Sequence, residues 1–187
     1  MFTGIIKKLG EIVQTQDTPE GKRLWIATDM DPVHFSLGNS IAVDGVCLTV
    51  ESFEDGRFQS IAVPETLEKT TLSDLKLNDS VNLEFPLTLQ TAIAGHMVSG
   101  HVDGIGEVLK AGADYWISVP QELMKYIPVK GSLTINGVSL TVAEVKDTEV
   151  RIALIPETLE RTNLGTAKQV NLEIDLIARY LERLNQK

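Results

Sequence analysis

The chain contains the same unit twice, and this internal repeat constrains the fold more than any other feature. DGVCLTV returns as NGVSLTV, and the glycines of the two stretches, Gly45 and Gly137, are 137 − 45 = 92 residues apart. PETLEKTTL at Pro64 returns as PETLERTNL at Pro156 with the same offset. The openings TGIIKKLGEI and SGHVDGIGEV, from residues 3 and 99, differ by 99 − 3 = 96. Small changes of offset indicate short loop insertions in equivalent elements, which predicts two similar domains joined near PLTLQTAIAG.

Each copy is predicted to be built from short strands separated by turns. RLWIATD, SIAVDGVCLTVESF and RFQSIAV are rich in β-branched and aromatic residues, and EDG between the last two is typical of a tight hairpin turn. The two PETL stretches, each opened by a proline, are the only segments inside the copies that favour helical turns. An all-β barrel or sandwich is therefore the predicted class of each copy.

The C-terminal stretch DLIARYLERLNQK departs from this pattern. Ile177, Tyr180, Leu181 and Leu184 recur at helical spacing on one face, and Asp175 stands where a helix cap is expected. A helix of about three turns is marginal in water by itself, so it should dock on its own chain or on a neighbour.

Composition narrows the classes of partner. The net charge is −9, aromatic residues make up 5% of the chain, and no basic run occurs, so neither a nucleic-acid surface nor a membrane anchor is expected. The opening MFTGIIKKLG has lysines where a secretory signal needs its apolar core, and no later stretch has the length of a membrane span, which predicts a cytoplasmic protein. One cysteine allows neither an intrachain disulfide nor a cysteine-rich zinc site. A small molecule is the expected ligand.

The most informative positions are those at which the two copies differ. Cys47 aligns with Ser139, and Ile5 aligns with His101. A thiolate is a good nucleophile and histidine titrates near neutral pH, so Cys47 and His101 are the candidate nucleophile and general base. The alternative is that the cysteine is a small buried apolar residue and the histidine a structural one.

Other polar residues also have structural alternatives. His96 and His101 are five residues apart and would point to opposite faces of a strand, so together with Asp103 they do not predict a metal site. The serine and threonines of the LTV stretches favour strands, and the PETL segments can be capping turns. Asp175 is equally compatible with a cap and with a functional role. The glycine shared by the repeated phrases is expected to let the backbone approach a ligand.

Six stretches carry a resemblance to a known family: MFTG, GVCLTV, GHMVSGHVDG, KGSLTINGVSLTV, IPETLERTNLG and VNLEID. In this order, from Met1 to about Asp175, the chain resembles the riboflavin synthases. The resemblance implies two tandem six-stranded antiparallel Greek-key barrels, at residues 1–87 and 96–174, and a trimerisation helix at 175–187. It also implies dismutation of two 6,7-dimethyl-8-ribityllumazine molecules into riboflavin and 5-amino-6-(D-ribitylamino)uracil by transfer of a four-carbon unit, without cofactor or metal.

The resemblance also implies site residues. Cys47 and His101 would be catalytic, assisted by Ser139, Ser40 and Asp175, in a site formed between the N-terminal barrel of one subunit and the C-terminal barrel of its neighbour. The first pocket would be lined by Gly4, Ile5, Ile6, Cys47, Leu48, Thr49, Ile61, Ala62, Val63, Pro64, Glu65 and Thr66. The second would be lined by Gly100, His101, Val102, Lys130, Ser139, Leu140, Thr141, Ala153, Leu154, Ile155, Pro156, Glu157 and Thr158.

The sequence departs from the family pattern at two positions. Asp44 and Asn136 stand where the family commonly has asparagine and aspartate, respectively.

The alternative function is a non-catalytic lumazine- or flavin-binding antenna with the same fold. The motifs around Cys47, His101 and Ser139 favour the enzyme over this antenna. A homotrimer is the expected assembly, and association with a separate lumazine synthase is left open.

Overall fold

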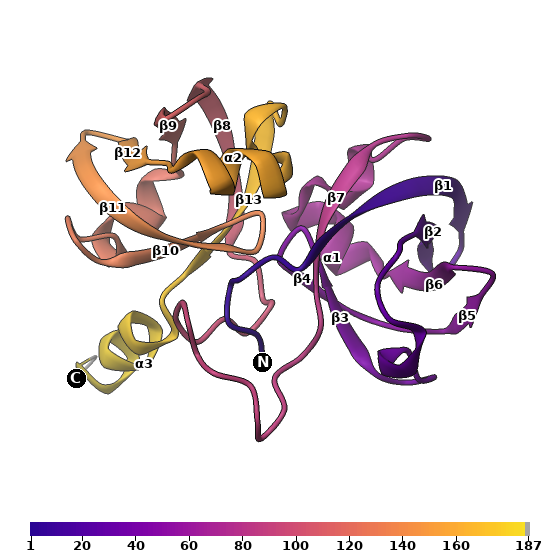
Figure 1. Ribbon diagram of the computed structural model, residues 1–187. Helices are drawn as coiled ribbons and strands as arrows, with labels where there is room; N and C mark the ends of the chain where they lie inside the picture. Colours follow the sequence, from indigo (N-terminus) through magenta and orange to yellow (C-terminus); the bar gives the residue numbers. More distant parts are fainter. Residues whose placement is uncertain (186–187) are drawn as a thin grey trace.

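The computed structural model describes residues 1–185 and consists of two antiparallel β-structures followed by a helix (Figure 1). The N-terminal half contains β1 (Lys8–Thr18), β2 (Gly21–Ala27), β3 (Ser40–Val43), β4 (Val46–Thr49), β5 (Ser52–Glu54), β6 (Arg57–Ala62) and β7 (Ser80–Glu84). The C-terminal half contains β8 (Gly104–Lys110), β9 (Asp114–Ser118), β10 (Ser132–Ile135), β11 (Val138–Lys146), β12 (Glu149–Ala153) and β13 (Gln169–Ile174). The helices are α1 (Pro64–Lys69), α2 (Pro156–Arg161) and α3 (Leu176–Asn185), with 3-10 turns η1 (Pro32–His34), η2 (Thr71–Asp74), η3 (Gln121–Tyr126) and η4 (Asn163–Gly165).

The two halves have the same strand order. The C-terminal strands close into a barrel in the order β10-β11-β12-β9-β8-β13, and the N-terminal sheet runs β4-β3-β7-β1-β2-β6-β5. The strands β4 and β5 at its two ends correspond to the single strand β11, whose register shifts between Val142 and Glu144. A bulge bends a strand and disrupts its ladder. The same bend at Val50 and Glu51 separates β4 from β5, so the N-terminal half has seven strands instead of the predicted six.

The predicted fold class is confirmed, with one local correction. The class is all-β with two barrel-like sheets and a C-terminal helix, and α1 and α2 each begin at the proline of a PETL stretch. SIAVDGVCLTVESF does not form one strand, because Asp44 and Gly45 both have positive φ, 46° and 79°, and form a tight turn between β3 and β4. Asp-Gly favours such a turn, so the signal was present in the sequence. The last two residues of the predicted helix, 186 and 187, lie outside the described residues.

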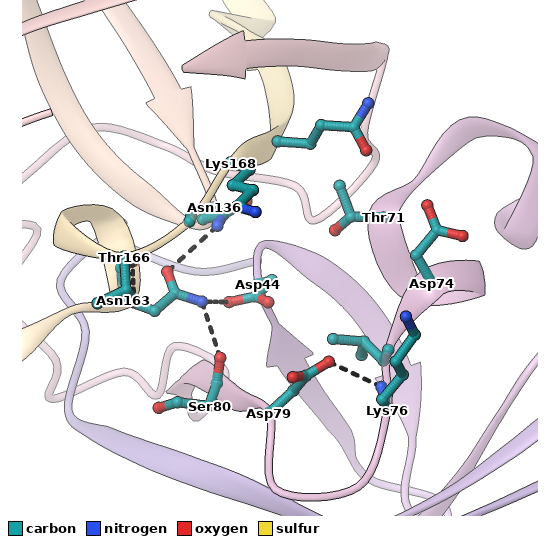
Figure 2. Close-up of a pocket in the computed structure, with 13 residues that line it drawn as sticks. Asp44, Thr71, Asp74, Lys76, Asp79, Ser80, Asn136, Asn163, Thr166 and Lys168 are labelled. Carbon is teal, nitrogen blue, oxygen red and sulfur yellow. Dashed lines mark hydrogen bonds between the residues drawn. The ribbon is translucent and has the colours of Figure 1, made fainter. Parts of the chain in front are cut away.

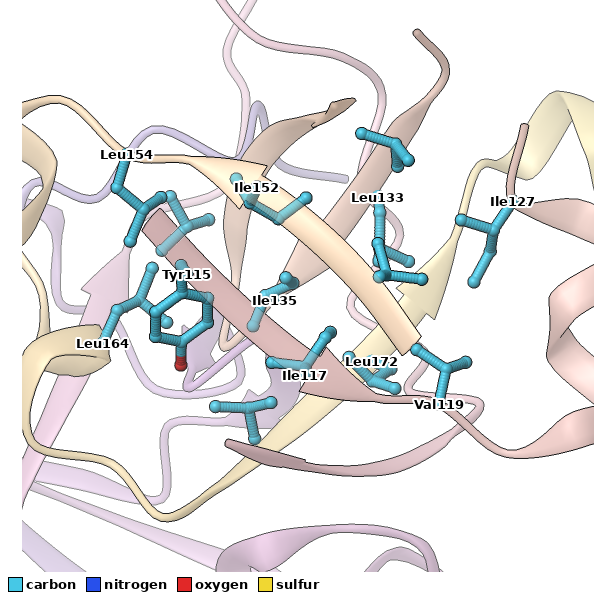
Figure 3. Close-up of a cluster of buried hydrophobic side chains, with 14 of the residues drawn as sticks. Tyr115, Ile117, Val119, Ile127, Leu133, Ile135, Ile152, Leu154, Leu164 and Leu172 are labelled. Atoms are coloured by element: carbon cyan, nitrogen blue, oxygen red, sulfur yellow. The ribbon is translucent and has the colours of Figure 1, made fainter. Parts of the chain in front are cut away.

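Each half encloses its own apolar core. In the C-terminal barrel, Tyr115, Ile117, Leu133 and Leu172 are fully buried, and their side chains fill the space inside the strands (Figure 3). In the N-terminal barrel the aromatic ring of Phe35 stacks on a neighbouring phenylalanine at 4.3 Å between centroids. Burial of these side chains is the main source of stability for each half. No helix among residues 1–185 combines the length and hydropathy needed to cross a membrane.

The barrels meet at the two turns that contain the repeated glycines. A side chain on Gly45 would place its Cβ 2.6 Å from the nitrogen of Gly137, and one on Gly137 would be 2.8 Å from the nitrogen of Gly45. We expected these glycines to let the backbone approach a ligand, and this expectation is wrong. Their missing side chains let the backbones of the two turns approach each other. Asn82 donates to the carbonyl of Asn136 at 2.8 Å, and its counterpart Asn171 donates to that of Asp44 at 2.9 Å. These reciprocal bonds relate the barrels by an approximate two-fold axis.

The segment before the first strand of each barrel packs on the other barrel. Phe2 and Val98 form a reciprocal backbone bridge, and the N-terminus lies between the two barrels (Figure 1). Ile6 belongs to the C-terminal core, whereas Val102 packs against the N-terminal core. We name these segments, residues 1–6 and 96–102, the first and second leaders. Their exchange makes each half depend on the other.

Candidate functional site

Two equivalent pockets lie where the exchanged leaders meet the barrels. The Cys47 pocket has a volume of about 390 Å³ and is lined by Val46, Cys47, Glu65, Thr66, Lys69, Thr70, Gly100, His101, Val102, Asp103 and Arg179. The Ser139 pocket has a volume of about 260 Å³ and is lined by Gly4, Ile5, Ile6, Val138, Ser139, Ile155, Glu157, Thr158, Arg161 and Thr162. Most lining residues of one pocket are the repeat partners of those in the other, so the duplication produced two versions of one site.

The grouping of the leaders expected from the resemblance is reversed. Gly4, Ile5 and Ile6 line the Ser139 pocket, and the segment 100–102 lines the Cys47 pocket. Backbone hydrogen bonds enforce this exchange, because Ser139 N donates to the carbonyl of Gly4 at 2.8 Å and Cys47 N donates to that of Gly100 at 2.9 Å. Cys47 and His101 therefore line the same pocket within one chain, without a neighbouring subunit.

A buried glutamate holds each leader in place. Glu84, at the end of β7, accepts from the backbone nitrogens of Thr3 and Gly4 at 2.8 and 3.0 Å. Glu173, at the end of β13, accepts in the same way from Ser99 and Gly100, at 2.7 and 2.9 Å. Burial raises the pKa of both carboxyl groups, and the donated hydrogen bonds act against that rise. These carboxylates connect the barrel strands to the leaders that complete the pockets.

The glycines of the leaders allow close approach to the reactive positions. Gly4 and Gly100 have φ of +76° and +82°, a conformation that favours glycine. A Cβ on Gly4 would lie 2.5 Å from the Cβ of Ser139, and one on Gly100 would lie 2.6 Å from the Cβ of Cys47. The chain thus needs glycine at both places to bring the leader backbone against the candidate reactive residue.

The Cys47 pocket combines a thiol, an exposed imidazole and several charges. Cys47 is half-buried on β4, and His101 projects from the second leader. Arg179, on α3, forms an ion pair with Asp103 at 2.9 Å, and the carboxylate of Asp103 also accepts from the nitrogen of Ile174 at 2.9 Å. Burial raises the pKa of Asp103, and the guanidinium acts in the opposite direction. Helix α3 therefore contributes a cation to this pocket.

The Ser139 pocket has a different inner surface. Ser139 is half-buried on β11, and its hydroxyl lies 2.7 Å from Nδ1 of His96. Ile5 stands at the place that His101 occupies in the other pocket. The residues that differ between the copies thus occupy equivalent places in two separate cavities.

The structure separates the predicted site residues into two groups. Those that line one of the two pockets are Gly4, Ile5, Ile6, Cys47, Glu65, Thr66, Gly100, His101, Val102, Ser139, Ile155, Glu157 and Thr158. Those outside the lining sets are Ser40, Leu48, Thr49, Ile61, Ala62, Val63, Pro64, Lys130, Leu140, Thr141, Ala153, Leu154, Pro156 and Asp175.

Several residues of the second group have a local structural role. Leu48, Ala62 and Leu154 are buried in the barrel cores. Ser40 faces Thr49 in the register of β3 and β4. The side chain of Asp175 caps α3 by accepting from the nitrogen of Ile177 at 2.9 Å. These contacts support the structural alternatives without testing a role in catalysis.

Sequence reasoning missed the cations of the pockets. Lys69 and Arg161 occupy equivalent positions at the ends of α1 and α2, and each lines its pocket. A signal for them existed, since the repeated PETLE is followed by a cation in both copies. Arg179 had no such signal, because α3 has no counterpart in the first copy.

A further cleft lies on the axis between the barrels, away from both pockets. It measures about 450 Å³, and Asp44, Asn136 and Asn163 form its floor, with Lys76, Asp79 and Lys168 among the other lining residues (Figure 2). Asn163 donates to the carboxylate of Asp44 at 2.9 Å. This cleft is lined by the hydrogen-bond network of the interface and contains neither Cys47 nor Ser139.

The described residues provide no group of three or more histidine, cysteine or carboxylate side chains that could hold a metal ion. Concave cavities with a few oriented polar groups are the usual form of a small-molecule site, and the Cys47 pocket is the more polar of the two.

Comparisons with known proteins agree with this geometry. A family model described as the lumazine binding domain matches residues 3–86 and again 99–175. A riboflavin synthase of Actinobacillus pleuropneumoniae is 42% identical over 191 residues, covering 98% of this chain and 89% of that protein. One of Mycobacterium bovis is 40% identical over 197 residues, covering 98% of each. The solved structure of LumP complexed with riboflavin matches with a TM-score of 0.84 and 26% identity, covering 93% of this chain and 99% of the other.

Proposed function

The chain belongs to the riboflavin synthase family, whose members carry two lumazine-binding domains, and from this premise we propose that it catalyses the dismutation of 6,7-dimethyl-8-ribityllumazine. Two molecules of the lumazine exchange a four-carbon unit. The products are riboflavin and 5-amino-6-(D-ribitylamino)uracil. All atoms of the two substrate molecules are found in the two products, so the overall reaction needs no external oxidant or reductant. It proceeds in this proposal without a cofactor.

One observation carries the proposal: a single chain holds two equivalent pockets that differ at their reactive positions. A dismutation uses two copies of one molecule as donor and acceptor. Two related pockets bind the same ligand skeleton, while Cys47 with His101 in one and Ser139 with Ile5 in the other present different groups to it. Positioning two reactive molecules can supply a large part of the rate acceleration.

The residues of the Cys47 pocket have complementary roles in this proposal. His101 takes a proton from the acidic 7-methyl group of the donor lumazine, which is bound in the Ser139 pocket of the neighbouring subunit and reaches the Cys47 pocket at the subunit boundary. Cys47 delivers or stabilises the nucleophile that adds to the acceptor ring. The cations Lys69 and Arg179 line the same pocket and are placed to offset negative charge that develops on a bound ring.

The assembly is part of the proposal. The apolar residues of α3, Ile177, Tyr180, Leu181 and Leu184, are between 55% and 81% exposed in the single chain. A second copy of the same helix is a suitable cover, and a trimer formed through α3 brings the Cys47 pocket of one subunit toward the Ser139 pocket of the next. The two bound lumazines would then meet at the subunit boundary.

The test is to mix the purified protein with the lumazine and to record flavin absorbance. Steady formation of riboflavin without added cofactor is expected. The likeness to LumP in complex with riboflavin favours a second candidate, a ligand-binding protein without turnover. Tight binding of the lumazine with no flavin formed would select that candidate and overturn the enzyme.

A further inference from the structure

His96 connects two hydroxyl groups, and one of them belongs to Ser139, which lines the Ser139 pocket. Its Nδ1 lies 2.7 Å from Ser139 Oγ, and its Nε2 lies 3.1 Å from Thr134 Oγ1. Thr134 and Ser139 face each other in the register of β10 and β11. The backbone nitrogen of His96 donates to the carbonyl of Thr3 at 3.2 Å, which joins the second leader to the first at this residue.

The burial of Thr134 sets the direction of the hydrogen bonds. Thr134 is almost completely buried, and within residues 1–185 its hydroxyl has no partner besides His96. If the hydroxyl accepted from the imidazole, its own proton would be buried without an acceptor, which is costly. Thr134 therefore donates to Nε2, and the neutral imidazole carries its proton on Nδ1.

This tautomer determines what Ser139 can offer. Nδ1–H donates to Ser139 Oγ, so the hydroxyl proton of the serine is free to donate into the pocket that Ser139 lines. Burial lowers the pKa of His96, which favours the neutral ring near neutral pH. The result is a chain of donors that runs from Thr134 through His96 to Ser139.

The Cys47 pocket lacks this chain. The repeat partner of Thr134 is Ala42, which faces Cys47 across β3 and β4. Ala42, Phe2 and Val98 form a small apolar cluster against Cys47. Cys47 thus packs against apolar side chains, whereas the hydroxyl of the equivalent Ser139 forms a hydrogen bond with the imidazole of His96. The two pockets differ in their supporting residues as well as at the reactive position.

We propose that His96 is a positioning residue that orients the Ser139 hydroxyl as a hydrogen-bond donor to a carbonyl oxygen or ring nitrogen of the ligand in the Ser139 pocket. This inference deepens the proposed function and rests on it for the identity of the ligand. The oriented hydroxyl makes the Ser139 pocket select a ligand edge that accepts a hydrogen bond. The Cys47 pocket has no equivalent chain of donors behind its thiol.

The first test is ligand binding by the full-length protein, with riboflavin as the probe. Titration calorimetry of the unmodified protein is expected to show two classes of site. His96→Gln should weaken one class about tenfold and leave the other unchanged, because only one pocket contains the chain of donors. His96→Asn should retain most of the affinity, since its amide N–H can occupy the place of Nδ1–H. The exposed His34 provides a matched control, and His34→Gln should change neither class.

The second test is the ¹⁵N spectrum of the histidine rings, assigned with the same variants. The expected result is a neutral His96 with its proton on Nδ1, and Thr134→Val should increase the population of the other tautomer. A proton on Nε2 in the unmodified protein would overturn the inference, as would equal loss of both binding classes in His96→Gln. This spectrum does not depend on turnover or on binding. If no flavin forms while the tautomer and the selective loss are observed, the proposed reaction fails and the role of His96 stands.

Discussion

Single residues explain why two copies of one unit produce two unlike pockets. The strands, turns and leaders are shared, and the pockets differ at Cys47 and Ser139 and at His101 and Ile5. The glycines of the leaders determine how closely each leader approaches. Changes at these positions should therefore affect one pocket without disturbing the barrel that carries it.

Replacing Cys47 with alanine should reduce turnover at least about tenfold while the free energy of unfolding changes by less than about 1 kcal/mol. The thiol is half-buried, so its loss leaves little cavity. Turnover of the lumazine and denaturant unfolding measure the two effects. An unfolded variant whose remaining folded fraction keeps full specific activity would show that Cys47 is only a core residue.

Gly100→Ala should damage the Cys47 pocket through the close contact of its Cβ with Cys47. Gly38 is a matched control, since its φ of +84° is nearly the same as the +82° of Gly100 and no atom of residues 1–185 outside its chain neighbours lies within 4 Å of its Cβ position. Gly38→Ala should cost about 1 kcal/mol of stability from backbone strain alone. Gly100→Ala should cost more and also weaken riboflavin binding at one class of site. Equal effects of the two substitutions would show that the leader tolerates the contact.

At the scale of elements, the turns between β3 and β4 and between β10 and β11 hold the barrels together. They are stabilised by backbone and amide hydrogen bonds, and one of them contains a buried acid. The carboxylate of Asp44 accepts from Asn82 N at 2.7 Å and from Asn163 Nδ2 at 2.9 Å. Burial raises the pKa of Asp44 to about 7, against the lowering effect of these donors. The equivalent turn has Asn136, which carries no charge.

Stability should therefore depend on pH through Asp44. Between the ordinary pKa of about 3.9 and the folded-state value of about 7, the folded protein binds a proton that the unfolded chain releases. The stability that this proton contributes is fully present below pH 4 and is lost as pH rises through 7. Asp44→Asn keeps an acceptor for both donors and should remove this pH dependence, so that the variant is more stable than the unmodified protein above pH 7.

Urea unfolding at several pH values between 4 and 8 measures this effect. Asp147→Asn is the matched control, because Asp147 has a similar φ of 50° in an exposed hairpin turn. The control should keep the slope of the unmodified protein. A variant at Asp44 that retains the full slope, or that loses stability at every pH, would contradict the role of the buried carboxyl.

For the whole molecule, α3 connects the Cys47 pocket to the assembly. Arg179 on its inner side pairs with Asp103, and Glu182 accepts from Lys125 and Tyr126 of the C-terminal half. Its apolar residues face outward and remain uncovered in the single chain. One face of the helix thus docks on its own chain, as its shortness predicted, and the other is available to a second copy.

Leu181→Glu should convert the proposed trimer into a monomer, because a buried carboxylate without a partner strongly disfavours association. Sedimentation velocity measures the assembly. Leu109→Glu is a matched control on β8, where an exposed leucine lies outside α3. The monomer should lose most of its turnover yet still bind riboflavin, since each pocket is complete within one chain. A trimer that survives Leu181→Glu would contradict the role of α3.

The sequence by itself determined the duplicated all-β architecture, the helical PETL turns and the terminal helix. These features arise from local preferences and from a repeat that is visible at constant offset, so they could be predicted. Alignment of the two copies also shows directly where they differ, so the sequence identified two divergent pairs, Cys47 with Ser139 and His101 with Ile5.

Only the tertiary structure decided which groups share a pocket. Each leader is far in sequence from the residue with which it pairs, Cys47 with Gly100 and Ser139 with Gly4. A carboxylate from each barrel, Glu84 or Glu173, holds the leader that crosses to the other barrel. No local pattern records such a crossing, which is why the predicted grouping of Gly4 and Gly100 was reversed. The bonds of His96 and the position of Arg179 are likewise contacts between segments far apart in sequence. Such contacts depend on how the two barrels pack together, and neither composition nor spacing encodes that packing.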